Sequence, residues 1–186
     1  MSLPEELLAQ ARELSLQTVP SAFQAGPRRA VSAAYYALLH ELLAGAAKQA
    51  LPPRCSPELH EASGRGYLHS TMKAGCLGLQ KAFAQQELRE DPGQRGGNPL
   101  PEPSKKIQQL FGGRIPPQPP VIAGAFVHLQ EARHRADYST LTRFAETHVR
   151  QLIADARKAV FLHRILPPKD AAPLYLLLRT RDLRLG

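Results

Sequence analysis

The chain has 186 residues, a length that suits one domain or one domain followed by a tail. Hydrophobic residues make up 43% of it and charged residues 22%, so the chain can bury a core and is not disordered as a whole. The net charge of +8 either favours contact with phosphate groups or only aids solubility.

The sequence predicts neither a membrane span nor a disulfide framework. No run of 18 apolar residues occurs, and the two cysteines, Cys55 and Cys76, are not spaced as a C-x-x-C pair. His60 and His69 together with Cys76 do not have the spacing of zinc ligands either. We therefore expect a cytoplasmic protein without membrane contact, metal or cofactor.

Two helices are predicted in the first part of the chain. The first covers 4–17, where apolar residues recur at helical spacing. The second covers 27–51, because Pro27 suits the first turn of a helix and two prolines follow the last residue. The middle of this second helix is apolar nearly all round, which predicts a buried position in a helical bundle.

A third helix is predicted from Ser63 or Gly66 to Arg89. A proline- and glycine-rich insertion over 90–120 follows it and contains eight of the 17 prolines. Because proline interrupts helices, we expect only a short helical turn there, around 104–111.

The rest of the chain predicts two more helices, over 121–135 and 140–165, and then a C-terminal tail over 167–186. The tail is apolar and then basic, so we expect a short strand or helix that packs on a partner. The fold class is therefore all-α. We expect an up-and-down bundle of four to five helices within 1–166, interrupted by the long insertion.

Two groups of polar residues stand out against these apolar helices. One group recurs on one face of the second helix and consists of Arg29, Tyr36 and His40. The other is the stretch RHRADY, 133–138, at the expected junction of the fourth and fifth helices, where we predict an ion pair between Arg133 and Asp137. Two interpretations stay open: either these side chains are buried apart, each with a local partner, or they meet in one polar cleft.

The stretches RRAVSAAYYALLHELL (28–43) and ARHRADY (132–138), in this order, resemble the HEPN domains of prokaryotes. The resemblance does not cover the insertion or the tail. It implies a bundle of four to five helices that is usually a homodimer. Many HEPN proteins are metal-independent endoribonucleases or toxins, often paired with a nucleotidyltransferase-type antitoxin. Their active site is an arginine followed, after four to six residues, by a histidine.

This chain departs from that pattern at the junction. Tyr138 stands where the pattern has a histidine after Arg133, and tyrosine, with a pKa of about 10, is a poor base at neutral pH. His134 lies next to the arginine and is the other candidate acid–base group. Arg143 and His148 match the spacing as well, but one continuous helix would place their side chains about 140° apart.

We expect a protein that binds RNA or a nucleotide, with or without cleavage. The candidate catalytic residues are Arg133, His134 and Tyr138, or alternatively Arg143 and His148. The candidate RNA- or nucleotide-binding residues are Arg29, Tyr36, His40, Arg135 and Asp137. The alternative function is a non-catalytic helical dimer that binds a partner protein.

Overall fold

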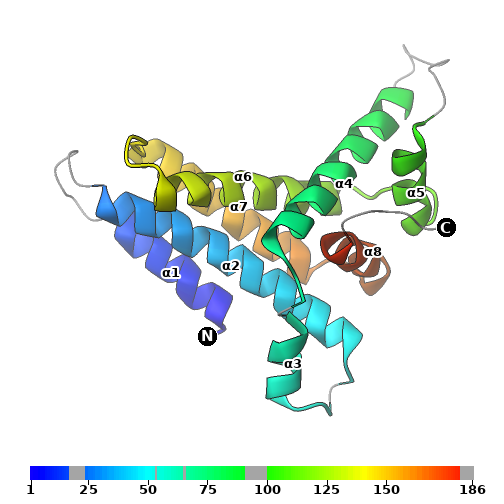
Figure 1. Cartoon of the computed structure of the whole chain (residues 1–186), viewed down its shortest axis with the longest axis horizontal. Coiled ribbons are helices and arrows are strands. Elements are labelled where there is room, and N and C mark those ends of the chain that lie inside the picture. Colours follow the sequence, from blue (N-terminus) through cyan, green and yellow to red (C-terminus); the bar gives the residue numbers. More distant parts are fainter. Residues whose placement is uncertain (17–23, 53, 65, 91–99, 181–186) are drawn as a thin grey trace.

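A computed structural model describes residues 1–16, 24–52, 54–64, 66–90 and 100–180. Over these residues the chain is all-α, with eight helices and no strand, as Figure 1 shows. The helices are α1 Leu3–Leu16, α2 Ala25–Ala50, α3 Pro57–Gly64, α4 His69–Glu90, α5 Glu102–Leu110, α6 Gln118–Tyr138, α7 Glu146–Arg164 and α8 Pro168–Arg179. The predicted all-α class is confirmed, with more helices in these ranges than the expected four to five. None of these helices is long and apolar enough to cross a membrane.

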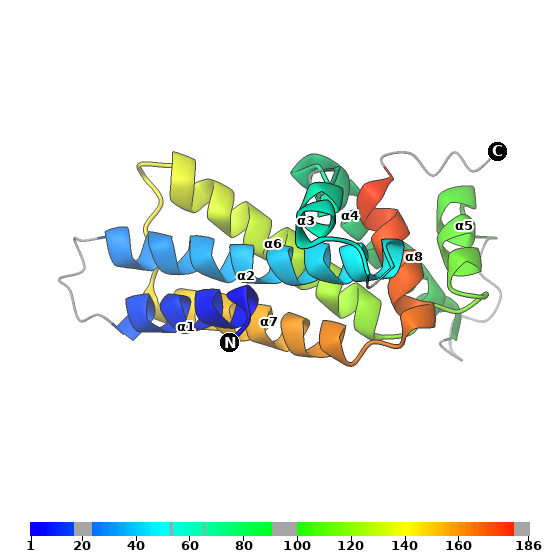
Figure 2. The same cartoon turned by 90° about the horizontal axis from the view of Figure 1, so that it is seen from below.

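Four long helices form the body of the molecule. α1, α2, α6 and α7 run alongside one another, and α2 contacts each of the other three (Figure 2). α4 packs across α6 and also contacts α5 and α8, while α3 packs on α2. The middle of α2 therefore lies beside both α6 and the beginning of α4.

Small side chains allow the neighbouring helices to pack closely on α2. Ala30, Ala34 and Ala37 are completely buried there, as are Tyr35 and Leu38. Since each large apolar side chain that is buried contributes about 1.5–3 kcal/mol, this helix supplies much of the core. The predicted buried position of the second helix is confirmed.

Prolines begin helices in this chain as well as ending them. α5, α6 and α8 each carry proline at one of the first two helical positions, where its missing N–H has no partner to lose. The insertion predicted over 90–120 is therefore largely helical where it is described, because it contains α5 and the first turn of α6. Residues 91–99 lie outside the described residues.

The predicted C-terminal tail is part of the bundle in its described portion. α8 buries Leu174, Leu177 and Leu178 within the chain and packs on α4 (Figure 1). The two helices are so close that a Cβ built on Gly75 would stand 2.1 Å from the carbonyl oxygen of Leu177. The apolar half of the tail therefore covers this chain's own core and not a partner, whereas 181–186 lie outside the described residues.

α6 and α7 are joined differently from the prediction. α6 continues to Tyr138, so the RHRADY stretch forms the last turns of a helix and not an interhelical turn. α7 begins only at Glu146, after a non-helical segment over 139–145. A tertiary contact holds this segment, because the N–H of Phe144 donates a hydrogen bond to the side-chain oxygen of Gln24 at 2.7 Å.

Arg28 of α2 fixes the same connection. Its guanidinium donates hydrogen bonds to the carbonyl oxygens of Ala136 at 2.7 Å, Ser139 at 2.6 Å and Thr142 at 2.8 Å. The last carbonyls of a helix have no intrahelical partner. One cation therefore binds the carbonyl of Ala136 near the end of α6 and two carbonyls of the connection that follows. Arg28, and not its predicted neighbour Arg29, is thus the arginine that joins α2 to this region.

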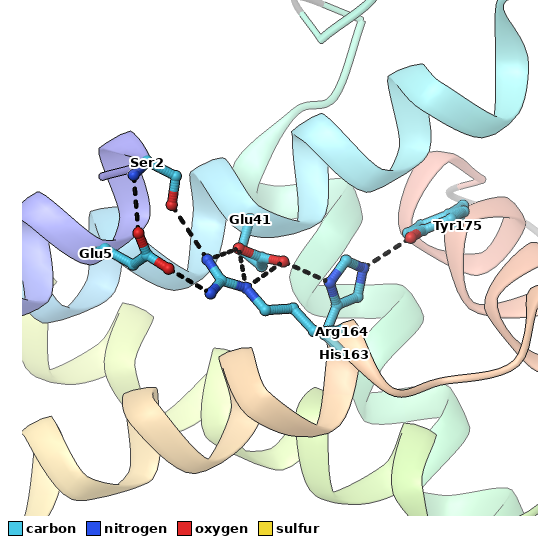
Figure 3. Close-up of polar contacts among 6 residues, drawn as sticks. All are labelled: Ser2, Glu5, Glu41, His163, Arg164 and Tyr175. Atoms are coloured by element: carbon cyan, nitrogen blue, oxygen red, sulfur yellow. Dashed lines mark hydrogen bonds and ion pairs between the residues drawn. The ribbon is translucent and has the colours of Figure 1, made fainter. Parts of the chain in front are cut away.

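A polar network joins α1, α2, α7 and α8 (Figure 3). Glu41 of α2 accepts hydrogen bonds from Arg164, the shortest at 3.0 Å, and lies 3.2 Å from Nδ1 of His163. The other ring nitrogen of His163 is 2.7 Å from the hydroxyl of Tyr175. Arg164 also reaches Glu5 at 2.7 Å. The network therefore ties the start of α1 and the middle of α2 to the end of α7 and to α8.

The centre of this network is removed from solvent. The side chains of His163 and Glu41 are only 6% and 12% exposed. Burial alone would raise the pKa of Glu41, but hydrogen bonds from His163 and Arg164 outweigh it and keep this pKa below its usual value. Burial raises the pKa of Tyr175 to about 12, so its hydroxyl keeps its proton. Gly45 leaves room for this arrangement, since a Cβ there would stand 2.2 Å from that hydroxyl.

Candidate functional site

The side chain of Arg133, near the end of α6, lies among three tyrosine rings. Its guanidinium carbon is 5.5 Å from the ring centre of Tyr36 and 5.9 Å from those of Tyr35 and Tyr138. Its Nη2 donates a hydrogen bond to the Tyr36 hydroxyl at 3.0 Å. At such distances the aromatic faces attract the cation. We call these four residues the arginine–tyrosine cluster.

The predicted ion pair between Arg133 and Asp137 is present, one turn apart on α6. Asp137 also accepts a hydrogen bond at 2.8 Å from the hydroxyl of Ser32 on α2. The side chains of the pair are 22% and 29% exposed, so solvent reaches both. Asp137 therefore orients the arginine at the edge of the cluster, where part of the arginine side chain is exposed.

His69, the first residue of α4, extends the cluster. The hydroxyl of Tyr35 lies 2.6 Å from its Nδ1. Burial raises the pKa of Tyr35, so the phenol keeps its proton and donates. Burial and the charge of Arg133 lower the pKa of His69, which favours the neutral ring. With the phenol as donor, His69 carries its own proton on Nε2.

Sequence reasoning did not select Tyr35 or His69. Consecutive residues on a helix point about 100° apart, so the tyrosine pair at 35–36 indicated one ring in the core and one in a neighbouring site. The structure shows this arrangement, with Tyr35 buried and Tyr36 half-buried. Nothing in the sequence joins His69 to that pair, because their contact depends on how α4 packs.

A groove with a volume of about 1230 Å³ opens beside the cluster, between the start of α1, α2, α3 and the start of α4. We call it the α2 groove. His40 and His69 both line it. The ring centre of His40 is 6.3 Å from that of Tyr36, and His69 is bonded to Tyr35, so the groove is continuous with the arginine–tyrosine cluster.

The remaining predicted site residues, the catalytic candidate His134 and the binding candidates Arg29 and Arg135, divide into two groups. His134 belongs to the exposed edge of the cluster, where its ring centre is 5.0 Å from that of Tyr138. Arg29 and Arg135 are exposed, and over the described residues no contact joins either one to Arg133. Arg135 lies two positions after Arg133, which places it about 200° around the helix.

The alternative pair, Arg143 and His148, lies at the start of α7. Because this helix begins three residues after Arg143, the two side chains are not fixed 140° apart on one continuous helix. The His148 ring stacks on Phe144 at 6.1 Å and lies 5.9 Å from the ring of His128 on α6. Nδ1 of His128 is in turn 3.5 Å from a carboxylate oxygen of Asp155. The contacts therefore join two histidines, a phenylalanine and an acid, and Arg143 directly precedes that phenylalanine in the chain.

Neither site resembles a metal centre. In the described ranges, no three His, Cys, Asp or Glu side chains are grouped so that they could hold a metal ion. Cys76 is buried, and burial raises the pKa of its thiol, so it is a poor nucleophile. The chemistry available at these sites is hydrogen bonding, charge and proton transfer by histidine.

Comparisons with known proteins identify no relative. No protein-family model matches the sequence, no curated protein matches it and no solved structure matches it. Functional conclusions therefore depend on the geometry described above and on the two sequence motifs.

Proposed function

We propose that this protein binds RNA or a nucleotide at the arginine–tyrosine cluster. The observation that carries the proposal is an arginine side chain, 22% exposed, whose guanidinium carbon lies within 5.5–5.9 Å of three phenol ring centres. RNA presents phosphates that arginine binds and flat bases that stack on aromatic side chains. The net charge of +8 would speed the encounter with a polyanion.

Each side chain of the site has a role in this proposal. Arg133 meets a backbone phosphate, and Nε2–H of His69 is a second donor for it. Tyr138 is 67% exposed, which is unusual for so large a ring, and it offers its face to an unpaired base beside His134. Asp137 positions Arg133 and does not touch the ligand.

The HEPN resemblance supports the same proposal and adds partners to it. We infer a homodimer and, from the resemblance, a nucleotidyltransferase-type antitoxin as the partner protein. Most apolar side chains of α2 and α8 are buried within the chain, so these two helices offer little surface for a dimer. The support for a homodimer is exposed apolar surface elsewhere. Leu77 and Leu88 on α4 are 47% and 53% exposed, and Phe161 on α7 is 61% exposed. A mass near 20 kDa by light scattering would exclude this dimer.

RNA cleavage at Arg143 and His148 is a second candidate function. The favouring observation is the late start of α7, which places the arginine in a non-helical segment and the histidine in the first turn of the helix. In this arrangement the arginine would bind the phosphate, and histidine would transfer the proton of the attacking ribose hydroxyl. Cleavage that persists in EDTA and is lost in His148→Ala supports this candidate, whereas intact RNA rejects it.

Binding is tested with a labelled single-stranded RNA by fluorescence anisotropy between 50 and 300 mM salt. Arg133→Gln should weaken binding at least tenfold and reduce the salt slope by about 1, because one phosphate contact is lost. Arg135→Gln is the matched control, since it removes the same charge from an exposed position of the same helix. Equal losses in both variants would indicate only diffuse charge attraction. No binding at 50 mM salt would leave the partner-binding dimer as the function.

A further inference from the structure

The lining of the α2 groove is unlike an ordinary protein surface. Among the described residues that line it, none is Asp or Glu, although three are histidines: His40, His60 and His69. Lys48 adds a cation. The groove is therefore suited to a ligand that carries negative charge and meets no carboxylate.

The floor of the groove is one continuous face of α2. The residues of this face that line the groove are His40, Leu43, Ala44, Ala47, Lys48 and Leu51. They recur every three or four positions, which is the spacing of one side of a helix. Lys48 lies eight residues after His40, about 12 Å along the helix, and the groove-lining residues of α2 between them, Leu43, Ala44 and Ala47, are all apolar.

The position of the groove identifies its occupant. At one end of the groove, His69 contacts Tyr35 and His40 lies beside Tyr36. Both tyrosines contact Arg133, and the proposed function places the RNA backbone at this arginine. A base attached to that backbone needs a neighbouring surface that is apolar, open and free of acids. The volume of about 1230 Å³ exceeds the 300–1,000 Å³ of typical small-molecule pockets, so there is room for more than one base.

We propose that the α2 groove holds unstacked bases of single-stranded RNA whose phosphates are bound at the arginine–tyrosine cluster. This inference rests on the proposed function and adds its substrate class. Duplex RNA is excluded from the groove, because its bases stay stacked and paired and only its backbone and shallow minor groove are exposed. Imidazole and phenol rings along the groove, such as those of His60 and Tyr67, provide faces for the bases.

Ala44→Glu tests the inference from the side of the protein. Ala44 is exposed on the floor of the groove, so the variant should fold, and the new carboxylate would face the bound nucleotides. Ala154→Glu on α7 is a matched control, because Ala154 is also exposed and the substitution changes the net charge equally. Each alanine is followed four residues later by a lysine, Lys48 after Ala44 and Lys158 after Ala154. Binding of a single-stranded hexamer should fall at least tenfold further in Ala44→Glu than in Ala154→Glu.

Changes in the RNA test the inference from the side of the ligand. A hexamer of abasic sugar–phosphate units should bind the wild-type protein roughly fivefold to a hundredfold more weakly for each base that the groove held. A blunt duplex of the same length should bind about as weakly as the abasic strand. Ala44→Glu should make little further difference to either of these two ligands, since neither one fills the groove.

Three results would overturn the inference. If the duplex or the abasic strand binds as tightly as the single strand, no base is held, although phosphate binding at Arg133 stands. If Ala44→Glu and Ala154→Glu weaken the binding of the single-stranded hexamer equally, the groove likewise holds no base. If no RNA binds to wild-type protein, the proposed function fails and this inference fails with it.

Discussion

Replacing Gly75 by alanine should push α8 away from α4 and destabilise the protein. The added Cβ would stand 2.1 Å from the carbonyl oxygen of Leu177, whereas a non-bonded carbon and oxygen approach to roughly 3.3 Å, so α8 must retreat by about 1 Å. A gap of this size forfeits a quarter to a half of the contact energy of the buried Leu174, Leu177 and Leu178. At about 1.5–3 kcal/mol for each leucine, the loss is about 1–4 kcal/mol.

Alanine also gains about 1 kcal/mol of helix propensity, so the net loss for Gly75→Ala is about 2 kcal/mol. In a chain of this size, that loss lowers Tm by about 4–8 °C. Gly78→Ala on the same helix is the control, since its Cβ would meet only the Ile107 Cδ1 atom at 3.4 Å and should add about 0.5–1 kcal/mol. Urea unfolding followed by circular dichroism measures both. If both variants are stabilised alike, α8 does not pack on α4 at Gly75.

Three further substitutions test the contacts that hold the site. Glu41→Gln should cost about 1–3 kcal/mol at pH 7. Because the folded-state pKa of Glu41 is depressed, the wild-type protein should lose this advantage as the pH falls below 4.5, and unfolding curves against pH should converge. Arg28→Met should cost about 2–4 kcal/mol, since three carbonyls lose a charged donor, and hydrogen exchange should then increase at the end of α6. Asp137→Ala should lower Tm by a few degrees, and an unchanged melting curve would mean that its pair with Arg133 is only a solvated contact.

The long helices could be predicted from the sequence because each carries its own repeating apolar pattern. α7 shows this pattern best, since its buried Val149, Leu152, Ile153, Ala156 and Val160 follow the helical period. α2 could be predicted from a long apolar stretch with a proline near its start. The short helices could be predicted in part: α5 lies where a helical turn was expected at 104–111, and α8 lies in the tail where a strand or helix was expected, but α3 was not expected. Prolines were interpreted as interruptions, although in α5 and α8 they occupy the first turn. The start of α7 could not be predicted, because Arg28 and Gln24, more than a hundred residues away, bind the non-helical segment before it.

The candidate site could be predicted only where its contacts are local or its residue types are unusual. Arg133 and Asp137 are four residues apart on one helix, so their ion pair could be read from the spacing. The contact of Tyr36 with Arg133 agrees with one of the two interpretations of the polar groups, whereas Arg29 is exposed and does not join it. The bond between Tyr35 and His69 and the α2 groove depend on how four separate elements pack, which no local pattern specifies.

The most direct test of RNA binding at the arginine–tyrosine cluster is photocrosslinking. A single-stranded RNA containing 4-thiouridine would be irradiated with the wild-type protein, and the crosslinked peptides would be identified by mass spectrometry. We predict crosslinks at Tyr138, His134 and Tyr36, and their loss in Arg133→Gln but not in Arg135→Gln. Crosslinks that lie only around Phe144 and His148, or that are spread over exposed lysines and unaffected by Arg133→Gln, would contradict the account.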